Sequence, residues 1–204
     1  MGSWPSPACS RSSRKRTRCA RVNRNFVPGM KQGGSVSYFD IRRAAPSTHA
    51  LYHSPELIRW LSDVTGEQLL TCPESDPHAC ALYYYTQPGD YIGWHYDTSF
   101  YRCKRFTVLL GLIQRSSSEL VCRVMEVGAT TPREARIRTL PGTLVVLNDA
   151  LHHCVTPNGE GEDRVVLSLE YVTDRLMGFF ARMVSNVKDA VAYFGIRNLL
   201  RPLR

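Results

Sequence analysis

The feature that most constrains the fold is a series of short apolar segments, separated by turns that are rich in Gly, Pro and Ser. These segments contain many β-branched and aromatic residues and have no helical segment between them, which predicts strands that pair antiparallel with one another. A parallel sheet would need a helical connection between successive strands. We therefore expect a mainly β fold, with a jelly-roll barrel (double-stranded β-helix) as the leading candidate over a sandwich. The predicted strands are residues 81–86, 91–97, 105–113, 119–127, 134–140, 141–149 and 164–172.

Helical periodicity flanks this β region on both sides. Just before it, apolar residues recur at steps of three or four, and Ser54 and Pro55 are suited to the N-cap and the first position of a helix. The same spacing returns over residues 174–195, where Gly195 is suited to end the helix. We expect both helices to pack against the sheet. Residues 195–204 mix Leu and Ile with three arginines, so contact with an anionic membrane surface stays open as a less favoured alternative.

The net charge of +8 belongs to the N-terminal segment. Residues 1–39 hold eight Lys or Arg and no acidic residue, which leaves 18 basic and 18 acidic groups in a formally neutral body. The first 25 residues are rich in Ser, Arg and Pro and have no apolar periodicity. We expect a disordered basic tail over residues 1–25 and a single domain over residues 26–204. An organellar transit peptide, a nuclear-import segment and a plain solvated extension all stay open for the tail.

The seven cysteines contain no Cys-x-x-Cys pair, which argues against a disulfide framework and against a Cys-rich zinc site. A reducing intracellular compartment fits this pattern better, and no apolar run is long enough to predict a transmembrane helix. We expect a cytoplasmic location, with organellar import by the N-terminal segment as the open alternative. The neutral body argues against a nucleic-acid partner, and nothing in the sequence predicts an oligomeric state.

His95 and Asp97 lie two residues apart at the end of a predicted strand, so strand alternation directs both side chains to the same face. An imidazole and a carboxylate on one strand, with a second imidazole from a distant strand, can bind Fe(II) and leave positions open for substrates. His152 and His153 follow a later strand and are the candidates for that second imidazole. Arg164 then opens the last predicted strand, where a guanidinium directed into a barrel can bind a carboxylate through two hydrogen bonds.

This ordered set of residues resembles the iron(II)/2-oxoglutarate-dependent oxygenases, in particular the prolyl-4-hydroxylase-like and small-molecule hydroxylase branch. The family motif H-x-V-x-P contains the distal ligand, and its first letter falls on His153 rather than on His152. The resemblance implies that His95, Asp97 and His153 bind the iron and form the catalytic centre. It also implies that Arg164 binds the far carboxylate of the co-substrate 2-oxoglutarate.

The resemblance covers about residues 82–172 and extends to further positions. In the family, a strand that ends in Tyr is followed by a Gly turn and the H-x-D strand, which matches Tyr85 here. An R-x-T sequence before an aliphatic run matches Arg105 and Thr107. Family members often have Ser two residues after the Arg, whereas this chain has Ser168 four residues after it. The resemblance thus implies Tyr85, Thr107 and Ser168 as additional contacts of the co-substrate.

The implied activity is that of a dioxygenase that uses Fe(II), 2-oxoglutarate and dioxygen to hydroxylate an unactivated C–H bond, releasing succinate and CO2. Halogenating members have a small residue at the position of Asp97, so this carboxylate favours hydroxylation. We expect a small metabolite as substrate, for example an amino acid, because the domain is compact and has no evident peptide-recognition module. A prolyl-hydroxylase-like enzyme that acts on a protein or peptide and a non-catalytic metal-binding jelly-roll protein stay open. A nucleic-acid demethylase is disfavoured because Glu170 stands where those enzymes have a second Arg.

The remaining aromatic and histidine side chains near these motifs are expected to have structural or surface roles. Alternation turns Trp94 and Tyr96 away from the His95 face, and we expect them to pack as part of the barrel. His53 and His78 lie in loop-like surroundings, which predicts exposure to solvent.

Overall fold

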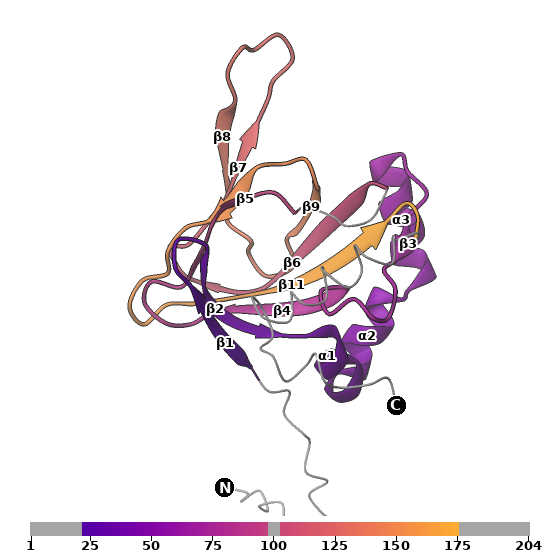
Figure 1. Cartoon of the computed structure of the whole chain (residues 1–204), viewed down its shortest axis with the longest axis horizontal. Coiled ribbons are helices and arrows are strands. Elements are labelled where there is room, and N and C mark those ends of the chain that lie inside the picture. The colour runs from indigo at the N-terminus through magenta and orange to yellow at the C-terminus, as the bar shows by residue number, and fades with distance from the viewer. Residues whose placement is uncertain (1–21, 98–102, 176–204) are drawn as a thin grey trace, which may run out of the picture.

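The computed structural model describes residues 22–97 and 103–175, which form one curled antiparallel sheet with three helices beside it (Figure 1). Nine strands follow one another in the order β8-β7-β10-β5-β2-β4-β11-β6-β9, while β1 pairs with β2 and β3 pairs with β11. The prediction of a mainly β, double-stranded β-helix fold is therefore confirmed, with the sheet curled into a half-barrel. The strands are β1 Asn23–Val27, β2 Lys31–Val36, β3 Leu70–Thr71, β4 Cys80–Tyr85, β5 Tyr91–His95, β6 Arg105–Arg115, β7 Leu120–Val124, β8 Arg133–Ile137, β9 Leu144–Asn148, β10 His153–Val155 and β11 Asp163–Val172.

Three short helices precede most of the strands: α1 Tyr38–Ala44, α2 Pro46–Tyr52 and α3 Pro55–Thr65. Helix α3 is the predicted one, since the hydroxyl of Ser54 accepts a hydrogen bond from the backbone N–H of Leu57 and Pro55 is the first helical residue. Gly66 ends it with a φ of +68°, the left-handed conformation that a residue without a Cβ adopts at least cost. Helices α1 and α2 have seven residues each, too few to give a clear periodic pattern in the sequence.

The larger part of the apolar core lies between the helices and the sheet. Tyr38, Tyr52 and Leu61 from the helices are fully buried, as are Leu169 and Tyr171 from β11. The tyrosines are anchored at their polar ends, since the hydroxyl of Tyr52 donates to the carbonyl of Glu170 and the hydroxyl of Tyr171 donates to the carbonyl of Tyr52. This packing fixes one end of β11 against the helical layer, and β11 is the strand that carries Arg164.

Strands β1 and β2 form a hairpin that the sequence pattern did not predict. The segment of β2 reads KQGGSV, and two adjacent glycines weaken the alternation by which strands are recognised. Strand β1 begins at Asn23, so it includes the last three residues of the predicted tail. Arg24 in this strand donates to the buried carboxylate of Asp90 at 2.5 Å, which ties the hairpin to the turn before β5.

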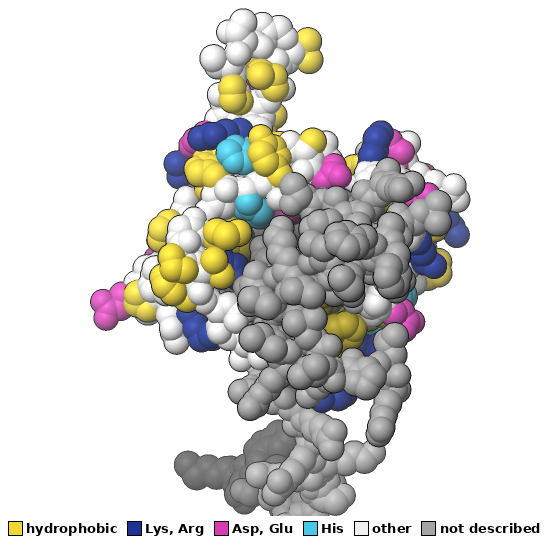
Figure 2. Space-filling model, in the orientation of Figure 1, with side chains coloured by type: hydrophobic (Ala, Val, Ile, Leu, Met, Phe, Trp, Pro, Cys, Tyr) yellow, Lys and Arg dark blue, Asp and Glu magenta, His cyan; other side chains and the backbone are white. Residues whose placement is uncertain are grey.

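Strands β7 and β8 form a second hairpin that projects away from the rest of the sheet (Figure 1). Hydrophobic side chains lie near its tip, and Lys or Arg side chains lie near its base (Figure 2). Met125 and Val127, in the connection between the two strands, are among the exposed apolar residues. The base of the hairpin joins β10, so β7 contributes to the wall of the barrel while the tip does not.

Some predictions fall on residues that the structure does not describe. The C-terminal helix expected over residues 174–195 lies almost entirely outside the described ranges, as does most of the tail expected over residues 1–25. The expected cytoplasmic location and the alternative roles of the tail therefore stay predictions. Within residues 22–97 and 103–175, no helix is long and apolar enough to cross a membrane. Cys80, Cys103, Cys122 and Cys154 are free thiols.

Candidate metal centre

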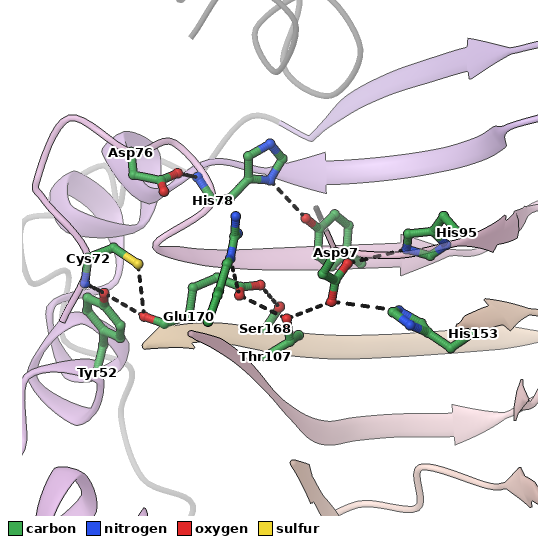
Figure 3. Close-up of polar contacts among 12 residues, drawn as sticks. Tyr52, Cys72, Asp76, His78, His95, Asp97, Thr107, His153, Ser168 and Glu170 are labelled. Atoms are coloured by element: carbon green, nitrogen blue, oxygen red, sulfur yellow. Dashed lines mark hydrogen bonds and ion pairs between the residues drawn. The ribbon is translucent and has the colours of Figure 1, made fainter. Parts of the chain in front are cut away.

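His95, Asp97 and His153 come together where β5 ends and β10 begins (Figure 3). The two strands pair antiparallel with His153 directly opposite His95, and the centroids of the two imidazole rings are 4.3 Å apart. Each of the three residues offers a ligand atom, and these atoms all lie within 4.8 Å of one another. Residues 58 positions apart in the sequence thus form a cluster of two nitrogens and one carboxylate on the inside of the barrel.

Backbone carbonyl groups fix the orientation of both imidazoles. Nδ1 of His95 donates to the carbonyl of Gly93 at 2.8 Å, and Nδ1 of His153 donates to the carbonyl of Leu151 at 2.9 Å. With the ring hydrogen on Nδ1, the lone pair of each Nε2 is free to bind a metal ion. The two Nε2 atoms face the carboxylate of Asp97, at 3.4 Å from Oδ1 for His95 and 3.7 Å from Oδ2 for His153.

Burial and mutual charge set the protonation of the three groups. Burial alone would raise the pKa of Asp97, but its contacts with the two imidazoles and with the hydroxyl of Thr107 outweigh burial and hold the pKa well below its ordinary value. Burial lowers the pKa of His153, whereas the contact with Asp97 outweighs burial at His95 and raises its pKa. The cluster therefore keeps an ionised carboxylate beside imidazoles, a nitrogen and oxygen donor set that suits Fe(II).

The three side chains line a pocket of about 60 Å³ whose walls also include Leu109, Leu120 and Val155. Arg164 lines the same pocket and is 1% exposed. Its guanidinium lies over the ring of Tyr85, with Cζ 4.8 Å from the ring centroid.

The guanidinium of Arg164 is only partly hydrogen-bonded by the protein. Its Nε donates to the hydroxyl of Thr139 at 3.2 Å, while its buried Nη1 has no hydrogen-bond partner among the described residues. The backbone of Thr139 can approach this closely because residue 111 is Gly. A Cβ at Gly111 would collide with the carbonyl oxygens of Thr139 and Leu140. A buried cation with an unsatisfied donor is costly, so this end of the pocket is suited to an anion.

The residues of the pocket can be compared with what Fe(II) and 2-oxoglutarate, the two groups that the resemblance implies, would need. Two imidazoles and one carboxylate on one side of a pocket match the donor set of a non-heme Fe(II) site with open positions. The unpartnered Nη1 of Arg164 offers hydrogen-bonding capacity to a carboxylate that enters the same pocket. The residues present therefore fit both Fe(II) and a dicarboxylic keto acid.

Thr107 and Ser168 line the pocket, but their hydroxyl groups point to carboxylates rather than toward Arg164. The hydroxyl of Thr107 lies 2.6 Å from Oδ2 of Asp97 and 2.9 Å from Oε2 of Glu170. The hydroxyl of Ser168 donates to Oε1 of Glu170 at 3.1 Å. Among the residues predicted to contact the co-substrate, only Tyr85 adjoins Arg164 in the described structure. The roles of Thr107 and Ser168 in co-substrate binding stay predictions.

Glu170 and Arg105 form a buried ion pair in this region, which the sequence analysis did not predict. Nε of Arg105 donates to Oε2 of Glu170 at 2.9 Å, and Glu170 is 5% exposed and lines the pocket. Burial raises the pKa of Glu170, while the charge of Arg105 opposes that effect. Strand alternation could have indicated the position, because Arg164, Ser168 and Glu170 are separated by even numbers of residues and face the same side of β11.

Trp94 and Tyr96 lie on the outer surface, so the prediction that they pack within the barrel is wrong. They are 38% and 50% exposed. The ring of Tyr96 stacks on His152 with the centroids 4.6 Å apart, and the guanidinium of Arg123 lies 4.2 Å from the centroid of the Trp94 ring. Both side chains point away from His95, as predicted. That face of β5 and β10, however, is exposed to solvent. His152 therefore belongs to an outer cluster, apart from the metal ligands.

The prediction of solvent exposure is wrong for His78, while His53 is partly exposed. His78 is buried, and its Nδ1 lies 3.2 Å from the hydroxyl of Tyr83, a residue of the pocket wall. The backbone N–H of His78 donates to Oδ1 of Asp76 at 2.8 Å (Figure 3). His53 is half-buried, and its Nε2 lies 3.3 Å from the hydroxyl of Tyr38. Both histidines pack where the helical layer and the connection before β4 meet, which local sequence does not reveal.

The chain is similar to known proteins both in part of its sequence and in its structure. The sequence profile of the family described as Halogenase D matches residues 26–103. Among solved structures, the non-heme α-ketoglutarate dependent epimerase SnoN from nogalamycin biosynthesis is similar at 12% identity, with a TM-score of 0.58 over 74% of this chain and 65% of SnoN. The same epimerase has been solved in complex with Fe3+, α-ketoglutarate and nogalamycin RO. The chain thus spans slightly less than two thirds of SnoN.

Two other structures are similar over a larger share of their length. An oxidoreductase of the 2OG-Fe(II) oxygenase family from Burkholderia pseudomallei has 15% identity and a TM-score of 0.60, over 79% of this chain and 76% of that protein. A prolyl-4-hydroxylase from Pseudomonas putida has 16% identity and a TM-score of 0.54, over 76% of this chain and 78% of that protein. A search of curated proteins found no match.

At such identities the structural likeness shows a shared fold, and the chemistry has to be carried by the residues of the site. The site supplies a His-x-Asp pair and a distal His within reach of one metal ion, on strands of a curled antiparallel sheet. The family match includes both residues of the His-x-Asp pair. In its fold, its ligand cluster and a family match over residues 26–103, this chain is similar to the Fe(II)/2-oxoglutarate-dependent oxygenases.

Proposed function

We propose that this protein is an Fe(II)- and 2-oxoglutarate-dependent dioxygenase that hydroxylates an unactivated C–H bond of a small metabolite. The observation that carries the proposal is the position of two features in one pocket. His95, Asp97 and His153 supply a facial set of metal ligands, and Arg164 supplies a buried guanidinium with an unpartnered Nη1. A metal site without an anion site would suit many metalloproteins, whereas the combination is suited to a keto acid that has a second carboxylate.

Each residue of the site has a role that its contacts support. The carbonyls of Gly93 and Leu151 keep the hydrogens of His95 and His153 on Nδ1, which leaves both Nε2 atoms to bind iron. Arg164 would pair with the far carboxylate of 2-oxoglutarate. When bound, iron and 2-oxoglutarate supply the oxidation, in which one oxygen atom of O2 enters the substrate C–H bond and the other enters succinate as CO2 is lost.

The surroundings of Arg164 prepare it for an anion. The ring of Tyr85 supports the plane of the guanidinium, and the hydroxyl of Thr139 accepts from its Nε, so two sides of the side chain are already fixed. Burial lowers the pKa of Arg164, yet an arginine stays protonated at neutral pH. A fixed and charged donor loses little conformational freedom when a carboxylate binds, which favours tight binding.

The match to the Halogenase D family raises halogenation as a second candidate reaction. The carboxylate of Asp97 argues against it, because halogenating relatives have a small residue at this position and thereby leave a coordination site for chloride. Here the ligand atom of Asp97 lies within 4.8 Å of those of both histidines, so the carboxylate would occupy that position. Hydroxylation is therefore the reaction that we propose.

A small-molecule substrate is supported by two observations. The pocket beside the metal-ligand cluster is small, about 60 Å³, which suits a compact ligand. The epimerase SnoN has been solved with a small molecule, nogalamycin RO, together with Fe3+ and α-ketoglutarate. The similarity to a prolyl-4-hydroxylase keeps a protein or peptide substrate as the alternative.

The test is anaerobic loading of the protein with Fe(II) and 2-oxoglutarate, followed by exposure to O2 and a screen for succinate release over amino acids, lipids and proline-containing peptides. We expect release that needs both Fe(II) and 2-oxoglutarate and that increases with a small substrate, together with a mass gain of one oxygen in that substrate. Stimulation by peptides alone would favour the prolyl-hydroxylase alternative. Metal binding without any affinity for 2-oxoglutarate would favour a non-catalytic metal-binding protein, and chlorinated product in the presence of chloride would favour the halogenase.

A further inference from the structure

One hydroxyl group separates the carboxylate of the predicted ligand Asp97 from a second buried carboxylate, that of Glu170 (Figure 3). This hydroxyl belongs to Thr107, which lies opposite Glu170 where β6 pairs with β11. A hydroxyl has a single hydrogen to donate, so the two carboxylates share one donor. Two like charges so close together repel one another unless a cation lies nearby.

Arg105 is the cation that pairs with Glu170. It lies two residues before Thr107 on β6, and its Nε donates to the same oxygen of Glu170 that Thr107 contacts. Burial alone lowers the pKa of Arg105, but the charge of Glu170, followed by that of Asp76 and, more weakly, that of Asp97, raises it well above its ordinary value. Of these three carboxylates, Glu170 is the one to which the guanidinium is hydrogen-bonded.

The ligand Asp97 is the less firmly fixed of the two carboxylates. Strand β5 ends at His95, so the backbone of Asp97 is outside the ladder, whereas Glu170 lies within the long strand β11. If Arg105 lost its partner on β11, its buried guanidinium would be left unpaired at a high cost. Asp97, which shares the hydroxyl of Thr107 with Glu170, is a neighbouring carboxylate with which it could then pair. A carboxylate that is bound in a fork by arginine competes poorly for a metal ion, since the same lone pairs serve both.

We propose that Glu170 is a positioning residue that binds the guanidinium of Arg105 and so keeps Asp97 available to the metal ion. This inference rests on the proposed function, because it takes Asp97 as a metal ligand. Direct coordination by Glu170 is not needed, since the cluster with metal-ligand spacing in the described residues comprises His95, Asp97 and His153 alone. Glu170 is also poorly suited to bind a cationic substrate, because its oxygens already accept from Arg105, Thr107 and Ser168.

The test measures binding of Co(II) as a probe metal, by visible absorption of the apo-protein during titration at neutral pH. Glu170→Gln removes the charge while keeping the size of the side chain, and it should raise the dissociation constant for Co(II) by about tenfold or more, the usual cost of losing a second-layer partner. Arg105→Met/Glu170→Met removes both charges, and it should bind Co(II) within about threefold of the wild type, because no guanidinium remains to compete for Asp97.

A matched control is Asp90→Asn, which neutralises another buried carboxylate that is paired with an arginine, Arg24, but lies at the turn before β5. It should leave the Co(II) dissociation constant unchanged. A merely structural role of Glu170 would make the double variant as weak as Glu170→Gln or weaker, and that result would overturn the proposal, as would wild-type affinity in Glu170→Gln.

If Glu170→Gln does not fold, Arg105→Met takes its place as the starting point. Adding Glu170→Met to Arg105→Met should then change the Co(II) dissociation constant by less than about threefold, and a tenfold loss would overturn the proposal. A wild-type protein that binds neither Co(II) nor Fe(II) would overturn the proposed function and this inference together. Wild-type binding with the wrong pattern among the variants would overturn this inference alone.

Discussion

Strand β11 directs two buried charges into one pocket, and the two differ in how completely the protein satisfies them. At Glu170, Arg105 and Ser168 donate to the carboxylate oxygens, and the hydroxyl of Thr107 contacts Oε2 while it also contacts Asp97. At Arg164, six residues earlier on the strand, Nη1 is buried without a hydrogen-bond partner in the described residues. Because both side chains are almost fully buried, the difference does not come from access to water.

A binding residue and a positioning residue in one pocket differ in whether the chain itself supplies all the partners of the buried charge. A buried charge whose partners are all supplied by the chain contributes to a finished network, in which each member holds the others in place. A buried charge with an orphaned donor has a cost that a ligand can remove on binding. By this criterion Arg164 is suited to bind an anion, and Glu170 is suited to position the residues around it.

The largest expected effect lies at the cluster between these two charges. Ala in place of His95, Asp97 or His153 should abolish Fe(II) binding, because loss of one of three ligands leaves an incomplete site. Anaerobic calorimetric titration with Fe(II) measures this, and circular dichroism should report a retained fold. His152→Ala is the matched control, because His152 packs on Tyr96 at the outer surface, and it should bind iron like the wild type. Full affinity in His153→Ala would assign the distal ligand elsewhere.

The second prediction concerns stability and contrasts the two charges directly. Arg105→Met should lower the free energy of unfolding by about 3 to 5 kcal/mol, because Glu170 is left as a buried charge without its cation. Arg164→Met should change it by no more than about 1 kcal/mol, since that guanidinium already has an unsatisfied donor. Urea denaturation of the apo-protein measures both changes. Equal losses in the two variants would contradict the distinction between a finished and an unfinished network.

The third prediction concerns the co-substrate. Arg164→Ala should weaken binding of 2-oxoglutarate to the Fe(II)-loaded protein by at least about a hundredfold, because the far carboxylate loses two charge-assisted hydrogen bonds. Arg164→Lys should recover part of the loss, since lysine keeps the charge but not the forked geometry. Calorimetric titration with 2-oxoglutarate compares the three proteins, with Fe(II) affinity as the internal control. Equal affinity for 2-oxoglutarate in all three would remove Arg164 from the site.

The smallest expected effect is at Asp90, a buried carboxylate in the turn before β5 whose hydrogen-bond partners the chain supplies. Asp90 is fully buried and accepts hydrogen bonds from Gln32 and from the backbone N–H groups of Thr86 and Gln87, in addition to the ion pair with Arg24. Arg24→Ala should therefore lower the free energy of unfolding by only about 1 kcal/mol, because most donors remain. A loss as large as that of Arg105→Met would show that the remaining donors do not compensate.

Deletion of residues 1–25 should cost at least as much as Arg24→Ala. The sequence pattern alone predicts no cost for this deletion, but strand β1 begins at Asn23 and includes Arg24. The deletion therefore removes the ion pair with Asp90 together with the first three residues of the strand. Thermal unfolding of the truncated protein beside Arg24→Ala measures the difference.

The sequence determined the parts of this protein that depend on local pattern. The alternation of apolar residues and the turns between them predicted the antiparallel sheet, and Ser54 and Pro55 predicted the start of α3 as the structure has it. The two-residue spacing of His95 and Asp97 predicted that they share a face. These features follow from the period of the strand and the hydrogen-bonding needs of a helix end, which involve only neighbouring residues.

Only the tertiary structure decided which side chains meet across strands and which face of a strand is covered. It joined Thr107 of β6 to Asp97 and to Glu170 of β11, and it left Trp94 and Tyr96 in solvent although they alternate with His95 as expected. Alternation assigns a residue to one of two faces, but the neighbours on that face come from strands that are distant in the sequence. The pairing of β6 with β11 and of β5 with β10 is a property of the curled sheet as a whole, and it makes a site from residues whose local sequences are independent of one another.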